Sequence, residues 1–273
     1  MTTAQTHDLS FTDAEVRKRY VDWERGEPDR EWACLTVLAT HAPGIAPTPL
    51  RREVDPDGSP VIVMSRLPGA PLGDAPFTSA QTVSLGEALR RTYAIPADAL
   101  VEAGVVERVY GPSTLPDLLV EWLSEPYDLA RCQDPGLVEH GISAALTWLS
   151  QADALPPAEL VVLGVSDRKP ANLVWDGQTC RLVDFEDSGT SDLAYELADQ
   201  IEHIASRLTA QLDPEALVGA VKLSVEQRDR MQRYRPLWAA FWLAMLLPGN
   251  GGVRRNPPGT TEEQVRHLVP LIS

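Results

Sequence analysis

Residues 164–186 read GVSDRKPANLVWDGQTCRLVDFE, and two short apolar runs inside this stretch decide the fold. The runs LVW and CRLVDF are separated by DGQT, and Asp-Gly between β-branched and apolar runs is a strong hairpin signal. With DGQT as the loop, the two strands pair antiparallel and Trp175 lies opposite Cys180. The stretch therefore predicts a tight β-hairpin.

Three polar residues gather around this predicted hairpin. The register puts Asn172 opposite Val183 and one diagonal step from Asp184, and diagonal partners in a sheet lie about 7 to 8 Å apart. Asp167 precedes the pair on the entering loop. An amide oxygen and a carboxylate at one point suit Mg²⁺, which keeps several waters and is completed by substrate phosphates.

This arrangement predicts phosphoryl transfer. The cation would neutralise charge on the moving phosphate, while the free aspartate orients or deprotonates the attacking hydroxyl. Turn chemistry alone would explain any one of the three residues. The joint spacing, five residues from Asp167 to Asn172 and twelve from Asn172 to Asp184, favours the functional interpretation.

The composition bounds the class of protein. The chain has 273 residues, 44% of them hydrophobic and 23% charged, enough for one large domain or two lobes. A formal charge of −15 argues against a nucleic-acid partner, because phosphate binding needs a basic face. The longest apolar run, LWAAFWLAMLL, is too short for a bilayer, and the N-terminus carries no signal-peptide core. We expect a cytoplasmic protein with no membrane partner.

Neither cysteines nor histidines form a ligand pattern. Cys34, Cys132 and Cys180 are isolated, so neither a disulfide framework nor a zinc site is predicted. The histidines are expected at the surface or in packing; they are His7, His41, His140, His203 and His267.

The first seventy or so residues are mixed in character. Strands are expected over 15–21 and 59–69, with a helix between them that has Pro28 near its start. The second strand ends in a Pro-Gly break, which suggests a lobe boundary.

The remainder is expected to be mostly helical. Helical spacing occurs in 85–93, 115–123, 137–149, 193–210 and 214–221. Ser224 with Gln227, and Thr260 with Glu263, each fit a capping box at a helix start. Pro236 is expected to kink or split the helix that follows Ser224.

The segment SDRKPANLVWDGQTCRLVDFEDSGTSDLAYELAD resembles the catalytic segment of the aminoglycoside phosphotransferase family of kinase-like enzymes. The family pattern is His-Gly-Asp-x-x-x-x-Asn, a strand, an aspartate that opens the metal-binding motif, and GDPxxDLA. By position, the resemblance implies Asp167 as catalytic base, with Asn172 and Asp184 as metal ligands. Lys169 stands where protein kinases have a lysine on the transferred phosphate. Asp192 matches an aspartate that is mainly structural in the family.

Weaker similarity extends over most of the chain. REWACLTVLATHAPGIAPTPL resembles the helix that presents a glutamate to the phosphate-binding lysine, which implies Glu31 as that glutamate. The lysine would come from VRKRY, with Lys18 the choice; Arg17 and Arg19 compete, because the strand register is open by one residue.

The segment VIVMSRLPG resembles the strand and linker between kinase lobes. The resemblance implies that the backbone of Met64, Ser65, Arg66 and Leu67 hydrogen-bonds the purine of ATP or GTP. It also implies an α+β, two-lobed protein-kinase-like fold. A reduced, sheet-containing nucleotide-binding lobe would cover 1–68, and a mainly helical lobe with the catalytic loop and substrate site would cover 69–273.

Two departures from the family pattern matter. Val165 and Ser166 replace His-Gly before the catalytic aspartate, and no glycine-rich loop precedes the lysine strand. The phosphate lid should therefore be shortened or absent, leaving the nucleotide more exposed to water. Lys169 is expected to offset part of the missing charge stabilisation.

The resemblance implies an Mg²⁺-dependent transfer of the γ-phosphate to a hydroxyl of a small molecule. An antibiotic is the suggested acceptor, and a cationic acceptor is one option. The alternative is a catalytically weak pseudoenzyme that binds nucleotide or a partner protein, which the absent loop and Val165 motivate. Retention of Asp167, Asn172 and Asp184 counts against it. A protein kinase is disfavoured, because the stretch after the hairpin is too short for an activation segment and contains no Ala-Pro-Glu motif.

Overall fold

A computed structural model describes residues 7–151 and 155–273. The chain forms two compact units. The first comprises Met1–Val109, Glu159–Leu193 and Thr209–Lys222; the second comprises Tyr110–Ala158, Ala194–Leu208 and Leu223–Ser273. This division by compactness does not test the lobe boundary expected after residue 68, which stays a prediction.

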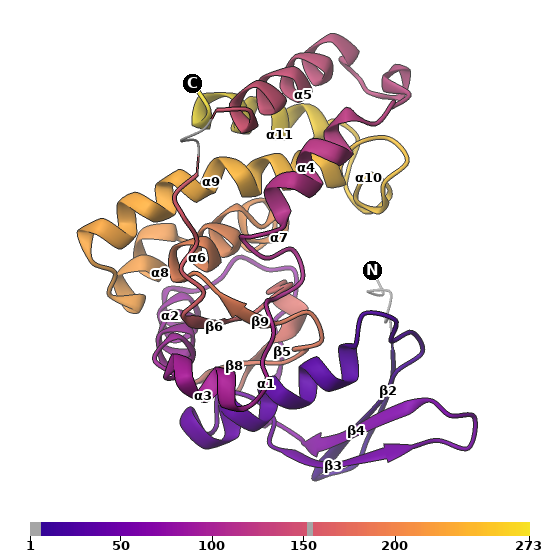
Figure 1. The fold of residues 1–273 in the computed structure, drawn as a ribbon, viewed down its shortest axis with the longest axis vertical. Coiled ribbons are helices and arrows are strands. Elements are labelled where there is room, and N and C mark those ends of the chain that lie inside the picture. Colours follow the sequence, from indigo (N-terminus) through magenta and orange to yellow (C-terminus); the bar gives the residue numbers. More distant parts are fainter. Residues whose placement is uncertain (1–6, 152–154) are drawn as a thin grey trace. The chain divides into compact units, whose positions relative to one another are not determined.

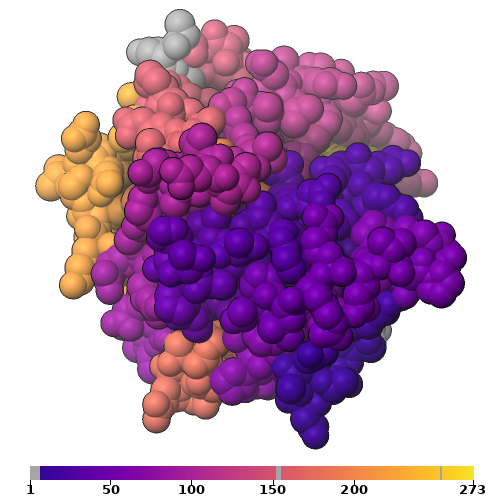
Figure 2. Space-filling model, turned by 60° about the horizontal axis from the view of Figure 1, so that its bottom comes forward, coloured from indigo at the N-terminus to yellow at the C-terminus, as the bar shows by residue number. Residues whose placement is uncertain are grey.

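An antiparallel sheet occupies the N-terminal part of the first unit, with strand order β1-β2-β4-β3 (Figure 1). Its strands are β1 (Asp8–Phe11), β2 (Glu15–Arg19), β3 (Pro49–Val54) and β4 (Pro60–Ser65). The two expected strands, over 15–21 and 59–69, correspond to β2 and β4, whereas β1 and β3 were not expected. Figure 2 draws the atoms of this N-terminal part of the chain in indigo to violet.

Helix α1 (Glu27–His41) packs on β3 and β4. Gly26 precedes it at a φ of 75°, a left-handed conformation that glycine adopts at little cost, and Pro28 stands in its first turn. The helix buries Cys34, Leu35 and Leu38 completely. It therefore holds a fixed position beside the sheet.

The predicted hairpin is confirmed. β7 (Leu173–Trp175) pairs with β8 (Cys180–Leu182) in the predicted register, with Trp175 opposite Cys180. The short strand β5 (Ala70–Pro71) adds to the outer edge of β7. Asp176 closes the turn, because its carboxylate accepts from the backbone N–H groups of Gln178 and Thr179 at 2.9 and 2.7 Å.

Other elements of the first unit surround this hairpin. They are α2 (Ser79–Tyr93), α3 (Ala97–Glu102), α8 (Pro214–Val221), the paired strands β6 (Val162–Gly164) and β9 (Gly189–Ser191), and the 3-10 turn η2 (Pro170–Asn172). Helix α2 packs on α8 and β8. Gly86 permits the close approach of α2 to α8, because a Cβ there would lie 2.5 Å from Ala220 Cβ.

The second unit is helical. It contains α4 (Leu115–Ser124), η1 (Leu129–Arg131), α5 (Pro135–Leu149), most of α6 (Leu193–Glu202), α7 (Ile204–Leu208), α9 (Val225–Met245), α10 (Gly251–Arg255), α11 (Thr260–Leu268) and η3 (Val269–Leu271). Helices α4 and α5 pack together, and α11 contacts both α5 and α9 (Figure 1). In its core, the buried ring of Tyr195 contacts the buried rings of Tyr234 and Trp238.

Three helix predictions need comment. The expected segment 193–210 is interrupted, because α6 ends at Glu202 and α7 begins at Ile204. The capping box at Ser224 is confirmed, but the one at Thr260 is wrong. Gly259, at a φ of 92°, is the N-cap there, and the Thr260 hydroxyl donates to Pro257 O at 2.7 Å instead.

Helix α9 runs through Pro236 without being split. Within the described ranges, each helix is too short or too polar to cross a bilayer.

Candidate active site

A cavity of about 460 Å³ lies in the first unit. Its walls come from β1, β2, α1, the segment after β4, and the loops on both sides of the β7–β8 hairpin. Every predicted site residue except Asp167 lines it: Lys18 and Glu31, Met64–Leu67, and Lys169, Asn172 and Asp184. The structure thus brings together residues from four distant parts of the chain.

Lys18 is the central cation of this cavity. Its side chain, 7% exposed, places the ammonium within 2.7 Å of three carboxylates, those of Glu31, Asp184 and Glu186. Burial alone would lower the pKa of Lys18, but the three carboxylates together raise its pKa above the ordinary value. Lys18 therefore remains charged.

The competing arginines of β2 point elsewhere. Arg17 pairs with Asp55 and lies 3.5 Å from Glu53, while Arg19 pairs with Asp8 and Asp57. Because side chains alternate along a strand, both lie on the face of β2 opposite Lys18. Of the three candidates, Lys18 is the one that lines the cavity.

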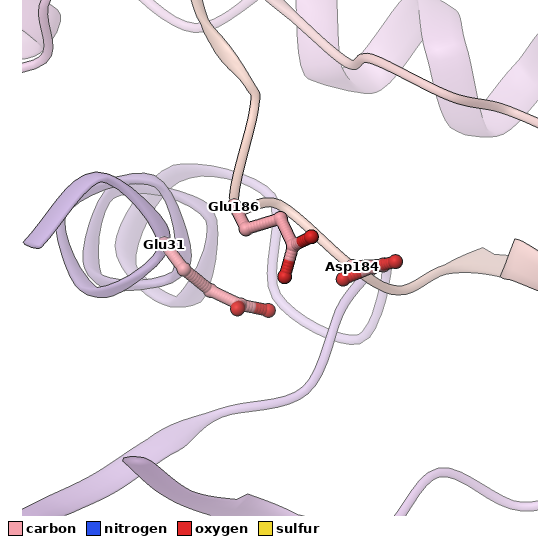
Figure 3. Close-up of side chains that lie close together, drawn as sticks. All are labelled: Glu31, Asp184 and Glu186. Atoms are coloured by element: carbon pink, nitrogen blue, oxygen red, sulfur yellow. The ribbon is translucent and has the colours of Figure 1, made fainter. Parts of the chain in front are cut away.

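Glu31 is held rigidly on α1. Its carboxylate is 1% exposed and accepts hydrogen bonds from Lys18, from the hydroxyl of Tyr20 and from the backbone N–H of Phe185 at 3.2 Å. Figure 3 shows it reaching from the helix toward the loop that carries Asp184 and Glu186. The last of these hydrogen bonds ties α1 to that loop.

Asp184 and Glu186 follow β8 on either side of the fully buried Phe185. Burial, reinforced by Glu31 and Glu186, raises the pKa of Asp184 to about 6 against the opposing effect of Lys18. Burial would also raise the pKa of Glu186, but His7 and Lys18 lower it to about 2. Both groups are therefore ionised at neutral pH.

These carboxylates could hold a cation. One oxygen each of Glu31, Asp184 and Glu186 lies within 4.8 Å of the others. Three carboxylates against the one ammonium of Lys18 leave a formal excess of two negative charges. Oxygen donors with this excess charge fit a divalent hard cation such as Mg²⁺.

The sequence predicted part of this donor set. Asn172 lies at the site, with its Nδ2 atom 3.4 Å from Asp184 Oδ2 and 2.8 Å from Asp167 O. Glu186 was missed. It stands two residues after Asp184, but the left-handed backbone of Asp184, at a φ of 71°, breaks the alternation of an extended strand, so spacing alone does not indicate it.

The loop before the hairpin presents Asp167 and Lys169. Asp167, whose side chain is 47% exposed, forms an ion pair with the ammonium of Lys169. Asp167 and Asp184 both have left-handed backbone, with φ of 48° and 71°. Such conformations are uncommon for residues other than glycine and concentrate at functional sites.

Val165 and Ser166 fill the place of the family's His-Gly. Val165 is 1% exposed, so it anchors the loop by packing. The Ser166 hydroxyl donates to Asp187 O at 2.9 Å, and its backbone N–H donates to Ser188 Oγ at 3.2 Å. The loop that carries Asp167 is therefore fixed without the histidine.

The linker after β4 has fewer free groups than the sequence suggested. The backbone N–H of Ser65 donates to Thr48 O at 2.9 Å, and that of Arg66 donates to Ala14 O at 2.8 Å. For Leu67 N–H, the described residues provide no hydrogen-bond acceptor. Leu67 is thus the linker position best able to donate to a ligand in the cavity.

Comparison with known proteins adds an independent finding. The model of the phosphotransferase enzyme family matches residues 8–237. Viomycin phosphotransferase from Streptomyces vinaceus is 32% identical over 148 residues, which are 52% of this chain and 50% of that protein. The match thus spans about half the length of this relative.

Solved structures resemble the whole chain. The GDP complex of aminoglycoside 2'-phosphotransferase-IIIa has a TM-score of 0.68 at 13% identity and covers 100% of this chain and 91% of that one. A choline/ethanolamine kinase family protein from Mesorhizobium loti has a TM-score of 0.63 at 18% identity, with 99% and 86% covered. At these identities the likeness shows the fold, and the predicted kinase-like α+β fold is confirmed.

Proposed function

Because the chain belongs to the phosphotransferase enzyme family, we propose that it is a nucleotide- and Mg²⁺-dependent O-phosphotransferase. It moves the γ-phosphate of ATP or GTP to a hydroxyl of a small molecule. The observation that carries this proposal is the cluster of Lys18, Glu31 and Asp184 in a cavity that also holds Asn172. Residues 1–68 serve as the nucleotide-binding lobe, and 69–273 supply the catalytic loop and acceptor site.

Each residue of the site has a role in this reaction. Asp184 and Asn172, joined by Glu186, hold Mg²⁺, which when bound neutralises charge on the nucleotide phosphates. Asp167 orients the acceptor hydroxyl and takes its proton. Lys169, paired with Asp167 in the free protein, stabilises charge on the transferred phosphate.

Lys18 would change partners when a nucleotide binds. In the free protein its ammonium is shared among three carboxylates. A cation held by Asp184 and Glu186 would compensate those two carboxylates, and Lys18, still paired with Glu31, would then be able to contact phosphate. Nucleotide affinity should therefore depend on Mg²⁺ more strongly than charge neutralisation of the nucleotide alone would require.

Hydroxylated antibiotics are the acceptor class to test first. Relatives and structural neighbours are described as acting on viomycin or as bound to kanamycin or spectinomycin. The chain's formal charge of −15 suits a cationic acceptor. Neighbouring structures contain GDP, ADP or AMP-PNP, which supports a nucleotide donor and an enzyme that works in the cytoplasm.

One observation favours a second candidate, a pseudoenzyme that binds nucleotide without transfer. No glycine occurs between His7 and Arg25, so the glycine-rich phosphate loop of active kinases is missing. The left-handed backbone of both Asp167 and Asp184 argues for catalysis, because a binding module has no need of such strain at both residues.

A transfer assay separates the two candidates. Purified protein is incubated with Mg²⁺, γ-labelled ATP or GTP, and aminoglycoside, nucleoside and peptide antibiotics, beside Asp167→Asn. The exposed Asp74→Asn serves as the matched control. We expect label on a small molecule with the wild type and the control, and its loss with Asp167→Asn. Nucleotide binding without transfer to any acceptor would contradict the enzyme and support the pseudoenzyme.

A further inference from the structure

Strand β1 presents one face to the cavity. Leu9 and Phe11 line it, as does His7 just before the strand. These positions alternate along the chain, as residues on one face of a strand do. In the register with β2, Leu9 lies opposite Lys18 and Phe11 opposite Val16. The stripe thus runs from the cluster of charges to the linker end of the cavity.

His7 is fixed at the charged end of this stripe. It is 6% exposed and packs against the Tyr20 ring at 4.7 Å between centroids. Its Nδ1 atom accepts from Val21 N–H at 3.3 Å, and its Nε2 atom lies 2.8 Å from Glu186 Oε2, within ion-pair distance. His7 therefore lies directly against the carboxylate of Glu186.

Phe11 stands at the opposite end and is 58% exposed, although it lines the cavity. The Arg66 guanidinium lies 5.9 Å from the Phe11 ring centroid. Arg66 also donates from Nη1 to Thr12 O at 2.9 Å and from its backbone N–H to Ala14 O at 2.8 Å. The turn after Phe11 is thus tied to the linker, which holds the ring over the cavity mouth.

The backbone of β1 cannot do what a glycine-rich loop does. Its residues pair with β2 in a regular ladder, so backbone N–H groups are not gathered around a phosphate. β1 is an edge strand whose outward N–H groups are spaced along it, so convergent contacts with a phosphate from this side would come from side chains.

We propose that β1 replaces the glycine-rich loop as the cover of the nucleotide, with a different side chain for each end of the ligand. Phe11 stacks on the purine, and His7 positions Glu186 at the phosphates and their cation. This inference rests on the proposed function, since it assumes a nucleotide in the cavity.

Ligands that represent one end of the nucleotide test the proposal. Calorimetry measures binding of adenosine, of tripolyphosphate with Mg²⁺, and of ATP with Mg²⁺ to the wild type, Phe11→Ala and His7→Ala. Ser10→Ala, on the exposed opposite face of β1, is the matched control. Melting temperatures verify that each variant is folded, and Phe11→Leu and His7→Gln provide milder replacements.

We expect each variant to weaken the binding of a different part of the nucleotide. Phe11→Ala should weaken adenosine and ATP about tenfold, as loss of base stacking does, and leave tripolyphosphate unchanged. His7→Ala should weaken tripolyphosphate and ATP about tenfold, leave adenosine unchanged, and be partly rescued in His7→Gln, which keeps a donor. The Phe11→Leu variant should still bind adenosine more weakly than the wild type does.

Two results would overturn the proposal. One is equal weakening of all three ligands by either variant, which would indicate a merely structural role. The other is no change in any ligand. Both leave the proposed function standing if the wild type binds ATP and transfers phosphate; a wild type that binds none of the ligands would overturn the proposed function as well.

Discussion

At the residue scale, the site carries more negative than positive charge, because three carboxylates surround the single ammonium of Lys18. Lys18 compensates only one of the three carboxylates that contact it, and leaving buried charge uncompensated costs folding free energy. Proteins accept such costs at functional sites, where a ligand restores the balance. The imbalance therefore predicts measurable effects on stability.

Lys18→Met removes the compensating cation. We expect the free energy of unfolding to fall by about 3 kcal/mol, and added Mg²⁺ to raise the melting temperature of this variant more than that of the wild type. Arg17→Met, on the solvent-facing side of the same strand, should lose less than about 1 kcal/mol and show no such Mg²⁺ response. Equal Mg²⁺ responses in the two variants would count against a cation at this cluster.

Asp184 should make the free energy of unfolding decrease as the pH rises, whereas most carboxylates have the opposite effect. Its pKa is raised to about 6 in the folded chain from 3.8, so the folded state binds more protons between about pH 4 and pH 6. The contribution of Asp184 to the free energy of unfolding therefore decreases as pH rises through that window.

Asp184→Asn should abolish this pH dependence. Relative to the wild type, the variant should gain about 3 kcal/mol between pH 4 and pH 7, measured by urea unfolding, while losing phosphotransfer. If the free energies of unfolding of the two proteins differ by the same amount at every pH, the pKa of Asp184 is not raised in the folded protein.

At the element scale, the register of the β7–β8 hairpin was predictable from the sequence, whereas the contacts of the residues that follow it were not. Its register follows from a local turn and alternating apolar residues, so Trp175 opposite Cys180 was predictable. Lys18 and Glu31 were found through the family resemblance. Glu186 and His7 meet only through tertiary packing of segments far apart in the chain, which no local pattern reports.

The linker contributes a glycine that the hairpin requires. Gly69 has a φ of 103°, and a Cβ there would lie 2.3 Å from Trp175 O. Gly177 in the hairpin turn has a similar φ of 100° but open space around it. Alanine at either position meets backbone strain, but only at Gly69 does it also collide with β7.

We therefore expect Gly69→Ala to lower the free energy of unfolding by about 2 kcal/mol more than Gly177→Ala does. Urea unfolding of both variants measures the difference. Equal losses would mean that the linker does not pack against β7 as closely as the β5–β7 pairing indicates.

At the scale of the whole molecule, the fold was predictable because its decisive features are local patterns linked by family resemblance. The break of the 193–210 helix at His203, whose Nδ1 atom accepts from Ala205 N–H, was not predictable, and neither was the left-handed Gly259 that caps α11. The molecule connects α1 to the segment after β8 through Glu31, beside a cluster of three carboxylates around Lys18. The proposed phosphotransfer depends on that cluster.

Electron paramagnetic resonance of Mn²⁺, as a stand-in for Mg²⁺, tests this central claim most directly. Free Mn²⁺ is titrated against the wild type and Asp184→Asn, each with and without ADP. We predict one tightly bound ion per wild-type chain, bound more tightly with ADP, and at least tenfold weaker binding in Asp184→Asn. The same Mn²⁺ affinity in both proteins, unaffected by ADP, would contradict the account.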